Sequence, residues 1–210
     1  MSINAHYRKD PHPAWAPKKY LAEAGGVFAL TLIVIALASS RFAGLTPLAA
    51  TLTVVMLVHA IGHISGTHIN PAITAGLFVQ KKITGNNAAA YILAQFAGAS
   101  LAAFVGVRFL NYHPMVPVST WPVGIAEGAG AFILGYGVAT VVYGRIRERW
   151  TGLAIGAYLL GAILISSRVS AGILNPAVAF GLGLFSASYV IAPILGAMLG
   201  IWCYRKIFAK

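Results

Sequence analysis

The sequence predicts an all-α membrane protein in which six transmembrane helices and two re-entrant half-helices form an inverted repeat. Three observations lead to this prediction. The chain is too apolar for a soluble domain, it contains six apolar stretches long enough to cross a bilayer, and one tripeptide occurs twice, half a chain length apart.

Composition places most of the chain inside a bilayer. Of the 210 residues, 59% are apolar and 9% are charged, and the mean hydropathy is +0.80. A soluble domain carries about 25% charged residues. Residues 1–19 are polar, contain three prolines and lack the apolar core of a signal peptide. They are expected to form a cytoplasmic tail, followed by a single transmembrane domain over residues 20–210.

Six stretches provide the roughly 20 mainly apolar residues that a spanning helix needs. They are residues 20–39, 45–64, 88–110, 122–143, 150–167 and 188–208. The first three belong to repeat one, about residues 20–110, and the last three to repeat two, about residues 122–208. Two further apolar stretches, 70–80 and 175–185, are too short to cross and are expected to be re-entrant.

The same tripeptide opens both short stretches, as Asn70-Pro71-Ala72 and as Asn175-Pro176-Ala177. Asparagine is a preferred N-cap and proline is favoured at the first helical position, so each tripeptide predicts the start of a helix. Asn175 follows Asn70 by 105 positions, and the same offset pairs Ser65 with Ser170. The chain is therefore predicted to contain two copies of one unit.

Three crossings per repeat is an odd number, so the second copy must lie upside down relative to the first. The two half-helices then enter from opposite faces and meet, N-terminus to N-terminus, near the midplane. The positive charges agree with this topology. Three cations fall outside, namely Arg41, Arg108 and Arg168, and twelve fall on the side of both termini, which the positive-inside rule makes cytoplasmic. This distribution explains the net charge of +11 without nucleic acid as a partner.

The segments that lead into the two tripeptides, residues 65–69 and 170–174, carry the predicted chemistry. Non-helical backbone at membrane depth must be buried in protein or line a water-filled cavity. Its carbonyls would accept hydrogen bonds from a solute, and the amides of Asn70 and Asn175 would donate them. Two facing helix N-termini repel cations. A neutral, hydrogen-bonding solute fits this lining; the alternative is that both asparagines only cap their helices.

Glu23 and Glu127 are intramembrane carboxylates that precede the two tripeptides at nearly equal distances. Such groups are functional hypotheses by default. One hypothesis is a proton relay in a coupled transporter; the other is a buried acceptor for the N–H groups of the two re-entrant segments. Because each repeat has one such residue, the supporting role is favoured.

Three histidines lie close together in the sequence, at His59, His63 and His68. No Cys, Asp or Glu nearby completes a metal-binding set, so no metal is expected. His68, two residues before Asn70, is expected to line the cytoplasmic half of a pore. No acid pair, activated nucleophile or phosphate loop is present, so neither an enzyme nor a bound cofactor is expected.

The run Gly62-His-Ile-Ser-Gly-Thr-His-Ile-Asn-Pro-Ala-Ile-Thr74 resembles the first signature of the aquaporin (major intrinsic protein) family, and the second tripeptide stands where its second signature belongs. The resemblance extends from about residue 20 to the end of the chain. It implies an hourglass fold, one pore in each protomer, and a homotetramer in the lipid bilayer of the cell's inner (plasma) membrane.

One departure from the family bears on selectivity. The family usually has an arginine directly after the second tripeptide, where this chain has Val178. The resemblance places the other three residues of the outer constriction at Ala50, Ile163 and Gly172. This selectivity filter has no aromatic or charged residue, unlike the filters of water-selective members and glycerol facilitators. A wide, apolar filter suits glycerol, urea, undissociated metalloid acids such as arsenite, and water; some bacterial relatives that lack this arginine are similar to arsenical and metalloid channels.

Three other functions are kept as alternatives: a water-selective aquaporin, a coupled secondary transporter, and a closed adhesive membrane protein. A transporter shares inverted repeats and broken helices but needs an ion-binding or titrating group at the midplane, where this sequence places amides. Arg168, in the loop before the second tripeptide, is a candidate to replace the missing filter charge.

Overall fold

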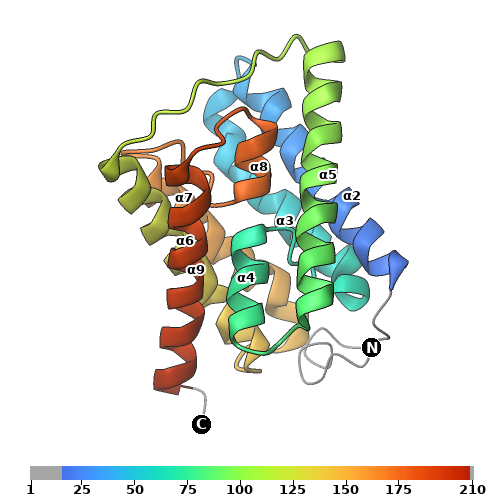
Figure 1. Cartoon of the computed structure of the whole chain (residues 1–210), viewed down its shortest axis with the longest axis vertical. Helices are drawn as coiled ribbons and strands as arrows, with labels where there is room; N and C mark the ends of the chain where they lie inside the picture. The colour runs from blue at the N-terminus through green and yellow to red at the C-terminus, as the bar shows by residue number, and fades with distance from the viewer. Residues whose placement is uncertain (1–15, 209–210) are drawn as a thin grey trace.

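The computed structural model describes residues 16–208, shown in Figure 1. Residues 1–15 of the expected tail lie outside the described residues. Helix α2 (Pro17–Ala38) begins at Pro17 rather than at residue 20, because proline lacks the N–H that the first helical turn leaves unpaired. Lys18 and Lys19 therefore belong to the first spanning helix and not to the tail.

Within the described residues, six helices are long and apolar enough to cross a membrane, which confirms the six predicted spans. Besides α2 they are α3 (Thr46–Ser65), α5 (Gly85–Phe109), α6 (Trp121–Val142), α7 (Thr151–Ser166) and α9 (Ala187–Phe208). Single 3-10 turns, Ala43–Leu45 and Glu148–Trp150, lead into α3 and α7. The six spans make the chain an integral membrane protein.

The two short helices begin at the repeated tripeptides, as predicted: α4 (Pro71–Val79) and α8 (Pro176–Gly181). Helix α8 ends earlier than the predicted residue 185, since Gly183 has a φ of +84° and turns the chain. In Figure 1 the two helices are stacked along the long axis of the molecule, with α8 above α4. Their N-termini face each other near the centre, and the two helices therefore enter from opposite ends.

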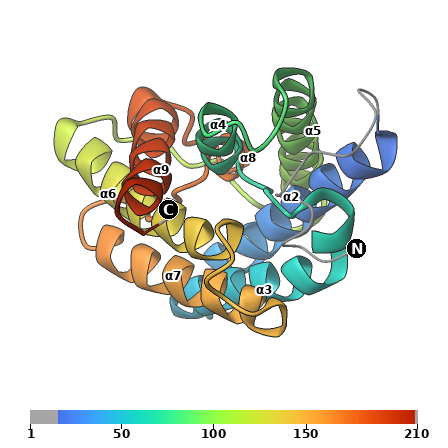
Figure 2. The same cartoon turned by 90° about the horizontal axis from the view of Figure 1, so that it is seen from below.

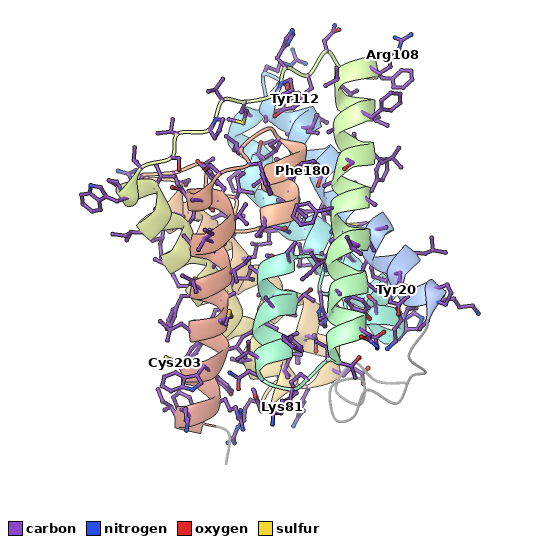
Figure 3. All side chains as sticks on the ribbon, in the orientation of Figure 1. Tyr20, Lys81, Arg108, Tyr112, Phe180 and Cys203 are labelled. Carbon is purple, nitrogen blue, oxygen red and sulfur yellow. The ribbon has the colours of Figure 1, made fainter. Side chains whose placement is uncertain are left out.

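The charged residues separate between the two ends of the molecule. Lysines and arginines at 81–82, 145–149 and 205–206 flank the ends of α4, α6 and α9 and the starts of α5 and α7. Arg41, Arg108 and Arg168 follow or close α2, α5 and α7 at the other end. Figure 3 shows Lys81 and Arg108 at these opposite ends. The separation matches the predicted topology; which end is cytoplasmic stays a prediction.

The two repeats interlock. Within repeat one α2 packs on α5, and within repeat two α6 packs on α9. The short helices are exchanged: α4 of repeat one packs mainly against α9, and α8 of repeat two mainly against α5, while α3 lies against α7. Seen from below in Figure 2, α4 and α8 lie between α5 and α9, and α3 and α7 lie together across the molecule. Neither repeat buries its own short helix fully, so the centre exists only when both are folded.

Glycines set the closest helix contacts. A Cβ at Gly98 of α5 would collide with the carbonyl oxygen of Ala24 on α2, and one at Gly196 of α9 with that of Gly128 on α6. Gly196 and Gly200 form a G-x-x-x-G pair, a pattern typical of close helix packing in membranes. Gly66, in another such pair, has a different role: with a φ of +84° it ends α3.

Replacing either close-contact glycine tests this packing. We expect Gly98→Ala and Gly196→Ala each to lower the free energy of unfolding by about 1–3 kcal/mol, the usual cost of overpacking. Thermal unfolding in detergent, followed by tryptophan fluorescence, measures the loss. Gly161→Ala is the matched control, because a Cβ there meets no atom within 4 Å. Equal stability of all three variants would show that these contacts do not limit packing.

Candidate functional site

Two short non-helical segments, residues 66–69 and 171–174, lead into α4 and α8. Both place a left-handed residue three positions and one position before the asparagine. In repeat one these are Thr67 and Ile69, with φ of 53° and 40°. In repeat two they are Gly172 and Leu174, with φ of 63° and 57°. Such a backbone is unfavourable for β-branched residues, so surrounding contacts must hold it.

The carboxylate of Glu23 holds the segment of repeat one. It is fully buried, and its Oε1 accepts hydrogen bonds from Ser65 Oγ at 2.6 Å and from the N–H of His68 at 2.9 Å. Its Oε2 accepts from the N–H of Ile69 at 2.6 Å and from Gln95 Nε2 at 2.7 Å. Four charge-assisted bonds on one carboxylate are a strong support for the strained backbone.

Glu127 supports repeat two in the same way. Its Oε1 accepts from the N–H of Ile173 at 3.0 Å, and its Oε2 from the N–H of Leu174 at 2.6 Å. A tyrosine adds to this support, since the hydroxyl of Tyr189 accepts from the N–H of Ala171 at 3.2 Å. Each repeat therefore uses its carboxylate to satisfy the two N–H groups immediately before its asparagine.

Both asparagines cap their own helices. Asn70 Oδ1 accepts from the N–H of Ala72 at 2.8 Å, and Asn175 Oδ1 accepts from the N–H of Ala177 at 3.1 Å. In each case a proline follows at the first helical position. Both asparagines therefore make the N-cap hydrogen bonds that the sequence predicts.

The amide nitrogens of the two asparagines join the repeats. Asn70 Nδ2 donates to the carbonyl of Leu174 at 3.0 Å, and Asn175 Nδ2 donates to the carbonyl of Ile69 at 2.8 Å. These reciprocal bonds tie each tripeptide to the last carbonyl before the other one. An amide nitrogen carries two hydrogens, so one hydrogen of each asparagine is left for a solute.

A cavity of about 320 Å³ runs past both asparagines. Its lining comes from α2, α3, α6 and α7, from the two non-helical segments, and from the first turns of α4 and α8. Residues 16–208 bring no Asp, Glu, Lys or Arg to this lining. Seven of the predicted site residues line it: Ala50, His68, Asn70, Ile163, Gly172, Asn175 and Val178. The other tripeptide residues are buried at the helix starts outside the lining: Pro71, Ala72, Pro176 and Ala177.

Glu23 and Glu127 also lie outside the cavity lining. Their oxygens face the backbone of the re-entrant segments and not the cavity. This geometry favours the supporting role over a proton relay.

The four predicted filter residues line one cavity, but Arg168 does not join them. It is exposed after the end of α7 and does not line the cavity, so it brings no charge to the filter position at Val178. The lining there is aliphatic, without a charged side chain.

His68 is buried against the cavity. Its Nδ1 lies 3.2 Å from Thr74 Oγ1, and its ring packs edge-on against Tyr91 with centroids 5.0 Å apart. His59 and His63 are exposed on α3. In residues 16–208, no three His, Cys, Asp or Glu side chains come together as a metal-binding group.

Several lining residues were missed in the sequence. Thr67 and Ile73 are the counterparts of Gly172 and Val178 at the 105-residue offset, and this offset could have identified them. Met115 had no such signal. Met115 lines the end of the cavity toward the end of α8, because its N–H donates to the carbonyl of Leu182 at 2.9 Å. The same carbonyl also accepts from the hydroxyl of Tyr112 at 2.9 Å. Figure 3 shows Tyr112 at the end that holds Arg108.

The supporting role predicts unequal losses when each carboxylate becomes an amide. A glutamine has one NH2 group in place of a carboxylate oxygen, so some of the donors that faced the glutamate lose their acceptor. Each lost hydrogen bond to a charged group costs about 1.5–3 kcal/mol. We expect Glu23→Gln to lower the unfolding free energy by about 3 kcal/mol or more, and Glu127→Gln by less, because fewer donors bond to it.

Thermal unfolding in detergent measures both changes, and Glu148→Gln, at an exposed position in the 3-10 turn before α7, is the control. Folded variants should keep a solute flux that ignores a pH gradient. A wild-type flux driven by protons and abolished by Glu23→Gln would support the relay instead.

Comparison with known proteins agrees with this architecture. A sequence profile of the family described as major intrinsic protein matches residues 18–204. The chain is 36% identical over 172 residues to Aquaporin NIP1-1 of Zea mays, a match that covers 74% of this chain and 60% of that protein. It is 31% identical over 177 residues to Aquaporin AqpM of Methanothermobacter marburgensis, covering 73% of this chain and 72% of that protein.

Among solved structures, the X-ray structure of the aquaglyceroporin from Plasmodium falciparum is similar, with a TM-score of 0.78, 17% identity, and coverage of 93% of this chain and 98% of that chain. This likeness confirms the hourglass fold of six spans and two half-helices. The match of the family profile over nearly the whole chain shows that this protein belongs to the major intrinsic protein family, whose members are membrane channels and not enzymes.

Proposed function

We propose that the protein is a passive channel for small neutral solutes larger than water, such as glycerol, urea and undissociated arsenous acid, and that it also conducts water. The observation that carries this proposal is the uncharged lining at the filter. Ala50, Gly172 and Val178 are small, Ile163 is aliphatic, and Arg168 lies outside the cavity. Without an arginine or an aromatic ring, the filter leaves room for solutes with several hydroxyl groups.

The centre of the cavity supplies the hydrogen bonds that such solutes need. The free hydrogens of Asn70 and Asn175 are donors, and the carbonyls of the two non-helical segments are acceptors. The rest of the lining is mainly aliphatic, with Val54 and Leu159 among its residues. A polyol carries both hydroxyl and C–H groups, so it suits a lining that combines polar and aliphatic surface.

The same centre disfavours cations. The N-termini of α4 and α8 point toward it, each with a partial positive charge. Among residues 16–208, no carboxylate lines the cavity to offset that field. The coupled transporter is therefore disfavoured: His68 is the one ionisable side chain that residues 16–208 bring to the lining, and it would have to bind the coupling ion. The water-selective alternative is disfavoured, because the four filter positions carry no aromatic or charged side chain that would narrow the cavity there.

The assembly and placement that we propose are a homotetramer in the inner (plasma) membrane, with both termini cytoplasmic and one pore per protomer. Large apolar side chains exposed on the outer surface support contact with lipid and with neighbouring protomers; Leu21 and Leu93 are each 72% exposed. The excess of cations at the end where α9 finishes supports the orientation.

Solute flux in reconstituted vesicles tests the proposed selectivity. We expect proteoliposomes to swell faster than empty vesicles in glycerol, urea and arsenous acid, at rates linear in concentration and unaffected by pH or sodium gradients. Val178→Arg places a long cation in the filter and should lower glycerol and arsenous acid flux at least tenfold while water still passes.

Val116→Arg is the matched control, because Val116 is 85% exposed and lies outside the cavity lining. Stopped-flow light scattering measures all of these rates. A wild type that conducts water but excludes every larger neutral solute would contradict the wide filter.

A further inference from the structure

We propose that the step that sorts solutes by size lies in the inner half of the cavity, at Thr67, Ile73 and Ile155, and not at the outer filter. The inner half is the half toward the end where α4 finishes and α7 begins; the outer half is the half toward the start of α3 and the end of α8. The inference rests on the proposed channel function and adds the residues that limit solute size.

A two-fold relation connects the two halves of the cavity. The two segments before the asparagines have left-handed residues at matching positions, and the asparagine amides exchange hydrogen bonds with matching carbonyls. A residue of repeat one and its partner 105 positions later therefore occupy equivalent places on opposite sides of the centre. Three filter residues have such partners in the inner half: Gly172 with Thr67, Val178 with Ile73, and Ala50 with Ile155.

Helix positions confirm the equivalence. Ala50 is the fifth residue of α3, which starts at the outer end, and Ile155 is the fifth residue of α7, which starts at the inner end. Ile73 is the third residue of α4, and Val178 is the third residue of α8. All of these residues line the cavity.

In each of these three pairs the inner member has the larger side chain. The side chain of Ile155 has three more carbons than that of Ala50. The side chain of Ile73 has one more methylene than that of Val178, and Thr67 has a side chain whereas Gly172 has none. Since protein interiors are close-packed, these groups take their volume from the cavity.

In the fourth pair the larger side chain lies in the outer half, but this one pair does not offset the other three. Ile163 lines the outer half, whereas its counterpart Val58 is 2% exposed and does not line the cavity. Three of the four pairs thus place the larger side chain in the inner half. A solute that passes the filter at Val178 still has to pass Ile73 and Ile155.

To test this proposal, each inner residue is replaced by the residue type of its outer counterpart: Thr67→Gly, Ile73→Val and Ile155→Ala. In proteoliposomes, stopped-flow swelling gives the ratio of the flux of a larger polyol, xylitol, to that of glycerol. We expect Ile155→Ala to raise this ratio at least fivefold, Thr67→Gly at least threefold and Ile73→Val less, with water flux changed less than twofold. A residue with a purely structural role would change all three fluxes together and leave the ratio as it was.

Ile165→Ala is the control, because Ile165 lies on the same helix as Ile155, is 60% exposed and does not line the cavity. Its ratio should equal that of the wild type. Thr67→Gly keeps the test valid if Ile155→Ala does not fold, since glycine adopts a φ of 53° without strain. Ile163→Ala, which enlarges the outer filter, should raise the ratio less than Ile155→Ala does.

Two results would overturn the inner filter alone: ratios for Thr67→Gly and Ile155→Ala that equal the wild type, or a larger increase from Ile163→Ala. Both leave the proposed function standing, because the wild type still conducts glycerol. A wild type that conducts no neutral solute larger than water would instead overturn the proposed function, and the inner filter with it.

Discussion

The structure depends on one constraint: two stretches of non-helical backbone lie at membrane depth, where no lipid group can bond to their N–H groups. Glu23 and Glu127 meet this constraint by accepting the N–H bonds of His68, Ile69, Ile173 and Leu174. With the N–H groups bonded to the carboxylates, the carbonyls of Ile69 and Leu174 accept hydrogen bonds from the opposite asparagines. Two buried acids that would be costly in isolation are therefore what permits a polar path through an apolar protein.

The same constraint ties the repeats to each other. Asn70 bonds to the carbonyl of Leu174, and Asn175 to the carbonyl of Ile69, so each segment completes the hydrogen bonding of the other. The helices are also interdependent, because α4 of repeat one packs mainly against α9 of repeat two, and α8 of repeat two mainly against α5 of repeat one. The polar path thus lies at the boundary between the repeats, where both helix N-termini and both amides meet. Support is unequal, since Gln95 assists Glu23, whereas Tyr189 assists the segment held by Glu127.

In the proposed channel, a cavity to which residues 16–208 bring no charged side chain would separate two tasks that one arginine would combine. We propose that the helix N-termini and amides at the centre, which are common to both halves, discriminate by charge. The aliphatic residues on either side would discriminate by size, with Val178 in the outer half and the bulkier Ile73 and Ile155 in the inner half.

The sequence by itself predicted the six spans, the two half-helices and their inversion, because hydropathy, capping residues and the 105-residue offset are local or periodic signals. It favoured a supporting role for Glu23 and Glu127 over a proton relay, and a family resemblance placed the predicted filter positions. Only the tertiary structure decided that one hydrogen of each asparagine bonds across the centre, that Arg168 stays outside the cavity, and that Met115 reaches the mouth. These depend on contacts between residues distant in the chain, and such contacts are fixed only when the helices pack.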